Sequence, residues 1–279
     1  MPVRLIAIDI DGTLLDARSQ LPEVNRDAVA RAVAGGIEVA LITGRRYDFA
    51  MPIARQLPCP LTMIVNNGAM VKSKDGETHL GYRLGRDTAR RVLDWLGEFR
   101  ELASVCFDRP RENQVIYERI DWDDPMRRGY FARNREFLAQ LSPLTDCLTE
   151  DPIQVMFTGP VARMRVVEAA LRALPFEHEF SLAITLYESR DFGLVDVIPP
   201  GCSKGATLAE WTRRRGLTRH DVMAIGDNLN DREMLEFAGL AIVMGNSVSE
   251  LKSLGWRETL SNDEGGVAAA IHAYALGAI

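Results

Sequence analysis

Short apolar runs alternate with helix-length stretches over the first third of the chain. The runs are too short for helices and indicate buried strands. The stretch after Pro22 carries Val24, Ala28 and Ala32 at helical spacing and ends at Gly35-Gly36. Such alternation predicts a parallel sheet with helices on both faces. The expected strands cover residues 5–8, 39–42 and 63–65, and a second helix covers about 47–57.

The same pattern returns near the end of the chain, after a long stretch of different character. The late elements are a helix over about 203–215 and strands at 222–225 and 240–243. The middle elements are a helix over about 86–101, an alternating segment at 114–117, a strand at 154–157 and a helix at about 161–173. We therefore expect an α/β protein whose parallel-sheet core, residues 1–81 and 193–279, is interrupted by a mixed α/β unit, residues 82–192.

Charge and composition exclude several classes of protein. Acidic residues outnumber basic ones by 39 to 33, which argues against a nucleic-acid or anionic-membrane partner. The charged stretch 109–135 mixes both signs, as a solvated face does. Apolar runs are too short to span a bilayer and the N-terminus lacks a secretory signal, so we expect a cytoplasmic protein. The four cysteines form no CxxC pair and are expected to be free thiols. The sequence does not indicate an oligomeric state.

Polar residues directly follow four of the expected strands. The carboxyl ends of parallel strands meet at one edge of a sheet, where ligands bind in such folds. Four polar segments at that edge therefore describe a candidate site. They are Asp9-Ile10-Asp11-Gly12-Thr13, Thr43-Gly44-Arg45, Asn66-Asn67-Gly68 and Gly226-Asp227-Asn228-Leu229-Asn230-Asp231.

Three acidic residues within these polar segments indicate a metal site. Asp9 and Asp11 are one residue apart, so both point the same way in an extended segment, and Asp227 is expected to arrive from a neighbouring strand end. Carboxylates held this close repel unless a cation lies between them. Oxygen ligands without histidine or cysteine favour Mg²⁺.

An anion-binding cradle is expected beside the metal. Lys204 follows Ser203, a good N-cap, so it lies in the first turn of a helix, where the helix dipole disfavours a cation. A local rule broken at a candidate site suggests a function. A helix N-terminus, this lysine and the Thr43 hydroxyl together would hold a phosphate. With a metal and a carboxylate nucleophile, they indicate phosphoryl transfer through an aspartyl-phosphate.

Each motif also has a simpler structural interpretation. Asp-x-Asp alone is compatible with a turn, and Thr43-Gly44 with a strand-end turn. The segment from Gly226 is compatible with an N-capped helix start, and most lysines are solvated. The occurrence of all four in this order, three of them directly after an expected strand, favours the site.

These motifs resemble those of the haloacid dehalogenase superfamily. The first, second and fourth motifs match Asp9-Ile10-Asp11-Gly12-Thr13-Leu14-Leu15, Thr43-Gly44-Arg45 and Gly226-Asp227-Asn228-Leu229-Asn230-Asp231, and Lys204 matches the third. Asn67-Gly68-Ala69 and Asn262-Asp263-Glu264-Gly265 further resemble the Cof-like hydrolases of subclass IIB. The resemblance implies a Rossmann-like core with an inserted α/β cap that determines substrate specificity. Arg46 and Asn66 depart from the proline and serine common in relatives.

The resemblance also implies a role for each matching residue. It makes Asp9 the nucleophile, and Asp11 the group that protonates the leaving oxygen and then activates water. It places Mg²⁺ on the Asp9 carboxylate, the Asp11 backbone carbonyl and Asp227. The other implied roles are phosphate binding by Thr43, Gly44, Lys204 and Asn230, and support by Asp231, Arg45 and Asn67, with Asp231 orienting Lys204 or the metal shell.

The sequence thus predicts a Mg²⁺-dependent phosphatase of small phosphorylated metabolites. A phosphosugar mutase shares the aspartyl-phosphate chemistry and stays open as an alternative. A binding protein that has lost catalysis would usually have lost Asp9 or Asp11, and both are present. Sugar phosphates, pyridoxal phosphate and flavin mononucleotide all stay open as substrates, because cap side chains decide among them.

Overall fold

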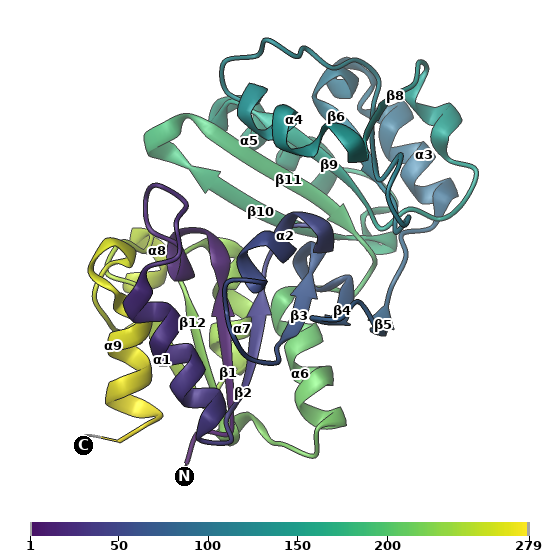
Figure 1. Cartoon of the computed structure of the whole chain (residues 1–279). Coiled ribbons are helices and arrows are strands. Elements are labelled where there is room, and N and C mark those ends of the chain that lie inside the picture. Colours follow the sequence, from purple (N-terminus) through teal and green to yellow (C-terminus); the bar gives the residue numbers. More distant parts are fainter. Residues whose placement is uncertain (1, 278–279) are drawn as a thin grey trace. The chain divides into compact units, whose positions relative to one another are not determined.

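The computed structural model describes residues 2–277 and divides into two units (Figure 1). One unit combines the residues up to Gly81 with those from Cys202 onward, and the other is Tyr82–Gly201. The expected core range, 1–81 and 193–279, includes residues 1, 278 and 279, which lie outside the described residues. An insertion between two halves of one sheet is therefore the organisation of the chain.

Within the described residues of the first unit, eight strands form one sheet in the order β14-β13-β12-β1-β2-β3-β4-β5. Central β1 is parallel to both neighbours, β2 and β12. The parallel arrangement extends to β3 and to β14, whereas β4 and β5 run antiparallel. The carboxyl ends of the parallel strands therefore meet at one edge. The bounds are β1 (Leu5–Asp9), β2 (Glu38–Ile42), β3 (Thr62–Val65), β4 (Met70–Ser73), β5 (Thr78–Gly81), β12 (Val222–Gly226), β13 (Leu240–Val243) and β14 (Arg257–Glu258).

Both faces of the central strand β1 are buried. Leu5 and Ala7 belong to an apolar cluster that includes residues of helices α6 and α7. Ile6 and Ile8 point to the opposite face and are equally buried. Helix α1 contacts β2 and packs along α9, as Figure 1 shows. The helices of this unit are α1 (Glu23–Ala34), α2 (Tyr47–Ala54), α6 (Lys204–Arg214), α7 (Arg232–Phe237), α8 (Ser249–Lys252) and α9 (Gly266–Tyr274). Burial on both faces explains why β1 is an unbroken apolar run.

The second unit has its own sheet and its own core. The strand order is β10-β11-β9-β6-β7-β8, and every pair is antiparallel except β7 with β8. Apolar residues of α3 and α5 pack with those of β9 and β11 in one cluster. The bounds are α3 (Arg86–Trp95), β6 (Ala103–Cys106), β7 (Val115–Tyr117), α4 (Arg128–Asn134), β8 (Leu138–Gln140), β9 (Gln154–Gly159), α5 (Val161–Arg172), β10 (Ser181–Tyr187) and β11 (Phe192–Ile198).

Three features differ from the sequence expectation. The core was expected to resume at residue 193, but β11 pairs with both β9 and β10 and so belongs to the inserted unit. The helix expected over 86–101 ends at Trp95, just before Gly97, a residue with low helix propensity, and a tighter 3₁₀ turn follows. The antiparallel strands β4 and β5 were not anticipated, because each mixes apolar with polar residues.

Among residues 2–277, none of the helices combines the length and the apolar character that crossing a bilayer requires.

Candidate functional site

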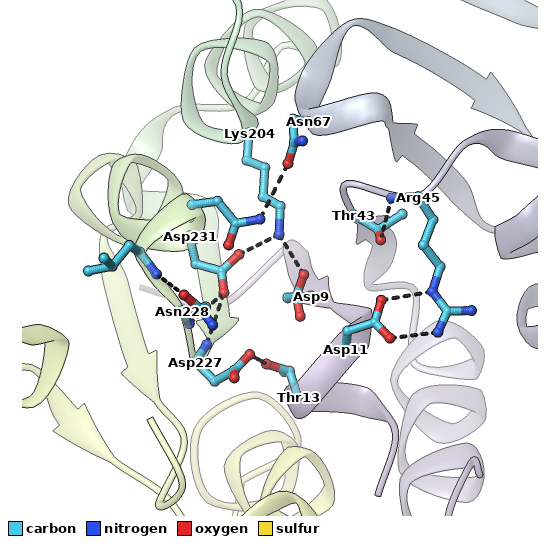
Figure 2. A network of polar contacts seen from close by, with 12 residues as sticks. Asp9, Asp11, Thr13, Thr43, Arg45, Asn67, Lys204, Asp227, Asn228 and Asp231 are labelled. Atoms are coloured by element: carbon cyan, nitrogen blue, oxygen red, sulfur yellow. Dashed lines mark hydrogen bonds and ion pairs between the residues drawn. The ribbon is translucent and has the colours of Figure 1, made fainter. Parts of the chain in front are cut away.

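Asp9, Lys204 and Asp231 form a buried ion-pair cluster at the carboxyl end of β1 (Figure 2). The Lys204 ammonium nitrogen lies 2.5 Å from Asp9 Oδ1 and 2.6 Å from Asp231 Oδ1. Asp9 ends β1, Lys204 begins α6, and Asp231 immediately precedes α7. None of the three residues is more than 4% exposed. The fold thus joins, largely shielded from water, residues up to 222 positions apart in the sequence.

Asp231 organises the loop that follows β12. Its Oδ2 accepts hydrogen bonds from the backbone N–H groups of Asp227 and Asn228, at 3.0 and 3.1 Å, while Oδ1 contacts Lys204. A Cβ atom on Gly226 would lie 2.7 Å from the Asp231 Cβ, so this close approach requires glycine. Asp231 therefore ties the position of Asp227 to that of Lys204.

The Asp227 carboxylate is held against the turn that follows β1. Thr13 donates its hydroxyl hydrogen to Asp227 Oδ1 at 2.9 Å. Gly12 has a φ of +84°, and a Cβ there would collide with Asp227 Oδ2. Glycine at position 12 thus serves both the left-handed backbone and the close approach of the carboxylate. Asp9, Asp227 and Asp231 each offer an oxygen within 4.8 Å of the others.

The charges of this cluster are unbalanced. Burial and the Asp231 carboxylate raise the pKa of Asp9 to about 8, against the opposing effect of Lys204. Burial and the Asp9 carboxylate likewise raise the pKa of Asp227 well above its usual value. Burial alone would lower the pKa of Lys204, but the Asp231 and Asp9 carboxylates outweigh it and raise that pKa. Asp9 and Asp227 therefore hold their protons to a higher pH than an exposed aspartate does, while the lysine stays charged.

The donor set fits a hard divalent cation. Three carboxylates face one ammonium group, so the ionised cluster carries two surplus negative charges. Closely spaced carboxylate oxygens are the ligands that Mg²⁺ prefers. Both oxygens of Asp231 already accept hydrogen bonds, which leaves Asp9 and Asp227 as the more available ligands. The absence of a side chain at Gly12 keeps the space beside Asp227 open.

The Asp11 carboxylate pairs with Arg45. The guanidinium donates from Nε to Oδ2 at 2.7 Å and from Nη2 to Oδ1 at 2.5 Å, a bidentate contact. Arg45 itself lies over the Phe49 ring, 4.5 Å from its centroid. The Asp11 side chain is 33% exposed, whereas that of Asp9 is 6% exposed. Two carboxylates from one turn therefore occupy different environments.

The segments after β2 and β3 meet beside this pair. The Thr43 hydroxyl oxygen accepts a hydrogen bond from the Arg45 backbone N–H at 3.1 Å. Asn230 donates its side-chain N–H to Asn67 Oδ1 at 3.3 Å. A Cβ atom on Gly44 would lie 3.1 Å from the same Asn67 oxygen, so the segment after β2 and the segment after β3 lie next to each other. Each site residue expected from the sequence belongs to the first unit.

The position of Lys204 depends on close packing at the start of α6. The Ser203 hydroxyl caps the helix by accepting the Ala206 N–H at 3.0 Å. A Cβ on Gly68 would collide with the Ser203 carbonyl, and Thr207 donates to the Gly68 carbonyl at 2.7 Å. A cation at a helix N-terminus is electrostatically unfavourable, and here Asp9 and Asp231 offset that cost.

Sequence reasoning assigned no role to several residues around the site. Thr13 and Asn228 lie inside recognised motifs, but their contacts with Asp227 and with the Leu229 N–H follow from the folded turn. Asn246 was missed altogether, although its side chain donates to the Gly12 carbonyl at 2.8 Å. It follows β13, so extending the search for polar strand ends to that strand would have found it.

Comparison with known proteins gives a consistent set of relatives. A family model described as haloacid dehalogenase-like hydrolase matches residues 6–271. Phosphatase YwpJ of Bacillus subtilis is 28% identical over 95% of this chain and 98% of its own length. HMP-PP phosphatase of Serratia proteamaculans is 30% identical over 90% of this chain and 87% of its own length.

Solved structures agree on the fold. A haloacid dehalogenase-like hydrolase from B. subtilis has a TM-score of 0.82 at 24% identity and covers 96% of this chain and 99% of its own. Another from Bacteroides thetaiotaomicron has a TM-score of 0.79 at 23% identity, covering 96% and 98%. The likeness extends over both units of the chain.

Proposed function

This chain belongs to the haloacid dehalogenase-like hydrolases, and from that premise we propose that it is a Mg²⁺-dependent phosphatase of small phosphorylated metabolites. The observation that carries the proposal is the buried Lys204 ammonium between Asp9 and Asp231, with the Asp227 carboxylate beside them. An anionic nucleophile, a cation site and a positive charge at one strand end are what phosphoryl transfer needs. Both named relatives reported above are phosphatases.

The first step of the proposed reaction forms a bond between an Asp9 carboxylate oxygen and phosphorus. The bond between phosphorus and the ester oxygen breaks, and Asp11 gives its proton to the departing oxygen. Asp11 pairs with Arg45 here, so this step requires that ion pair to open. The partial exposure of the Asp11 side chain gives a substrate access to it.

The second step returns Asp9 to its original state. Asp11, now a carboxylate, takes a proton from a water molecule as the water oxygen attacks phosphorus. The bond between phosphorus and the Asp9 oxygen breaks, and inorganic phosphate leaves. One carboxyl group thus serves as acid and then as base, which needs an environment different from that of the buried nucleophile.

The Asp9 carboxylate, the Asp11 backbone carbonyl and Asp227 are the proposed ligands of Mg²⁺. When bound, the ion would neutralise phosphoryl charge and so favour attack by an anion. Asp231 is proposed to orient Lys204, because one of its oxygens accepts from the Lys204 ammonium and the other from the Asp227 backbone N–H. Its contacts support this positioning role.

The remaining motif residues are proposed to bind and support the phosphoryl group. The four phosphate-binding residues are Thr43, Gly44, Lys204 and Asn230, and the supporting ones are Arg45 and Asn67. The hydrogen bond between Asn230 and Asn67, and the nearness of Gly44, support this grouping. The inserted unit, predicted as residues 82–192 and extending to Gly201 in the structure, is proposed to choose among substrates. The four cysteines are free thiols, as expected for the cytoplasmic setting that we propose.

Phosphate release from a panel of metabolites tests the proposal. Sugar phosphates, pyridoxal phosphate and flavin mononucleotide are incubated with the protein, with Mg²⁺ and with a chelator. We expect release from at least one ester, dependent on Mg²⁺. No release from any ester under either condition would overturn the proposal. Phosphoryl exchange between sugar positions with little free phosphate would identify a mutase instead.

A further inference from the structure

Three asparagine side chains hold the turn that carries Asp11. The turn spans Ile10–Leu14 and is closed by a hydrogen bond from the Leu15 N–H to the Ile10 carbonyl. Two of its carbonyls, and that of Leu15, accept hydrogen bonds from side-chain amides elsewhere in the first unit. The donors are Asn246 to Gly12 at 2.8 Å, Asn25 to Leu14 at 3.0 Å and Asn262 to Leu15 at 2.9 Å.

Asn246 and Asn262 act together. The Asn246 side-chain oxygen accepts a hydrogen bond from the Asn262 backbone N–H at 2.9 Å, while its nitrogen donates to Gly12. A single amide thus bridges two backbone groups, which requires both a donor and an acceptor in one side chain. We call this pair the amide clamp. It joins the loop after β13 and the turn before α9 to the turn that carries Asp11.

The amide clamp is connected to the proposed metal ligand Asp227 by two routes. The α-carbon of Gly12 lies so close to Asp227 Oδ2 that a Cβ there would collide with it. The loop that contains Asn246 also donates the Val248 N–H to the Asp227 backbone carbonyl at 3.1 Å. A shift of Asn246 would therefore displace both the backbone and the carboxylate surroundings of Asp227.

We propose that Asn246 and Asn262 are positioning residues for the phosphatase reaction, setting the turn of Asp11 against the metal ligand Asp227. This inference rests on the proposed function and extends it to a motif, Asn262-Asp263-Glu264-Gly265, to which the reaction assigns no role. Replacing a residue that orients a metal ligand without itself binding the metal typically reduces metal affinity or activity by about 10–100-fold.

Asn25 serves the fold as well as the turn, which makes it a poor test. It is fully buried, and its oxygen accepts the Ala268 N–H of α9 at 3.0 Å. Asn246 is exposed and lies in a loop, so its replacement leaves the core packing intact. Asn246 is therefore the position at which a positioning role can be separated from a structural one.

The test compares Asn246→Ala and Asn246→Asp with wild type and with the control Ser249→Ala. Ser249 is exposed, lies three residues further along, and donates its hydroxyl hydrogen to its neighbour Glu250. Three quantities are measured: the melting temperature in chelator, the Mg²⁺ concentration that gives half of the maximal thermal stabilisation, and kcat with KM on an ester that the wild type hydrolyses. Asn262→Asp provides a second variant of the clamp.

Both Asn246 variants should raise the Mg²⁺ midpoint or lower kcat by about 10–100-fold, with small changes in KM and in the metal-free melting temperature. Asn246→Asp adds a negative charge near a cation site, which by charge alone would tighten Mg²⁺ binding. Weaker binding in that variant would therefore support the clamp strongly. The control should match wild type.

Two outcomes separate this inference from the proposed function. If the Asn246 and Asn262 variants keep the wild-type Mg²⁺ midpoint and kcat, whatever their melting temperature, the clamp is structural and the inference is overturned. If wild type itself shows neither Mg²⁺ stabilisation nor phosphate release, the proposed function is what fails.

Discussion

Replacing Asp9, the proposed nucleophile, should make the metal-free protein more stable. Asn in place of Asp9 keeps the shape of the side chain and removes its charge. Asp9 is buried and its pKa is about 8 in the fold, compared with 3.8 in the unfolded chain. At pH 7 this difference costs the fold about 4 kcal/mol, at about 1.4 kcal/mol per pKa unit.

Lys204 leaves this figure unchanged, because its attraction for the Asp9 carboxylate already enters the pKa of Asp9 and an amide oxygen can still accept its hydrogen bond. A gain of about 4 kcal/mol corresponds to a rise of about 8–16 °C in melting temperature for a unit of this size. Phosphate release should fall by at least about a thousandfold in the same variant.

The pH dependence of the gain identifies its cause. The raised pKa of Asp9 means that, between about pH 4 and 8, the folded protein holds a proton that the unfolded chain has released. Wild-type stability therefore falls as the pH rises through this window. Asp9→Asn lacks that proton, so its advantage should be absent near pH 4 and grow toward pH 8.

Calorimetric melting in chelator from pH 4 to 8 measures this advantage. Asp75→Asn, at an exposed carboxylate in the same unit, is the matched control and should stay within about 0.5 kcal/mol of wild type. Saturating Mg²⁺ should reverse the order, because Asp9 is a proposed ligand and the ion stabilises most the protein that binds it most tightly. An advantage that does not change with pH, or a variant less stable than wild type at pH 8, would refute the electrostatic reasoning.

Three further predictions concern the reaction. Asp227→Ala should raise the Mg²⁺ concentration needed for half-maximal phosphate release by at least about a hundredfold while leaving the fold intact, since it removes a proposed Mg²⁺ ligand and not merely a residue that orients one; unchanged Mg²⁺ dependence would place the metal elsewhere. Substitutions of exposed side chains in the inserted unit should change the ranking of phosphate esters but not the Mg²⁺ requirement, and an unchanged ranking across several such variants would argue against a selecting role. Asp11→Asn should slow phosphoenzyme formation by about a hundredfold to ten-thousandfold with a sugar phosphate, whose leaving oxygen needs a proton, and far less with an activated aryl phosphate. Equal slowing in burst kinetics on the two esters would mean that Asp11 does not serve the leaving oxygen.

The parallel core was predictable because strands that are buried on both faces appear in the sequence as continuous apolar runs. Residues 5–8 of β1, 39–42 of β2 and 222–225 of β12 are apolar runs, and each run is followed by the segment that carries polar residues of the candidate site. Lys204 was predictable for the opposite reason, since its charge contradicts the helix terminus at which it stands. Both signals are local in the sequence.

What escaped prediction depends on contacts between distant segments. The pairing of Asp11 with Arg45 joins residues 34 positions apart and follows from the shape of two loops. Asn246 follows a strand, which is a local signal, but its contact with Gly12 is evident only once the two loops lie side by side. The end of the inserted unit was misplaced because the sequence of β11 resembles that of a core strand. Only its pairing with β9 and β10 shows that it belongs to the inserted unit.

The strand order also determines the order in which parts of a nascent chain can fold. The partners of β1 in the sheet are β2, made soon after it, and β12, made 213 residues after Asp9. At about 5–20 residues per second, one edge of the central strand stays unpaired for about 10–40 s of synthesis. The inserted unit is contiguous, so it can fold within that interval. An unpaired apolar strand invites association with other chains, and the exposed edge of β1 is where a chaperone would be needed most.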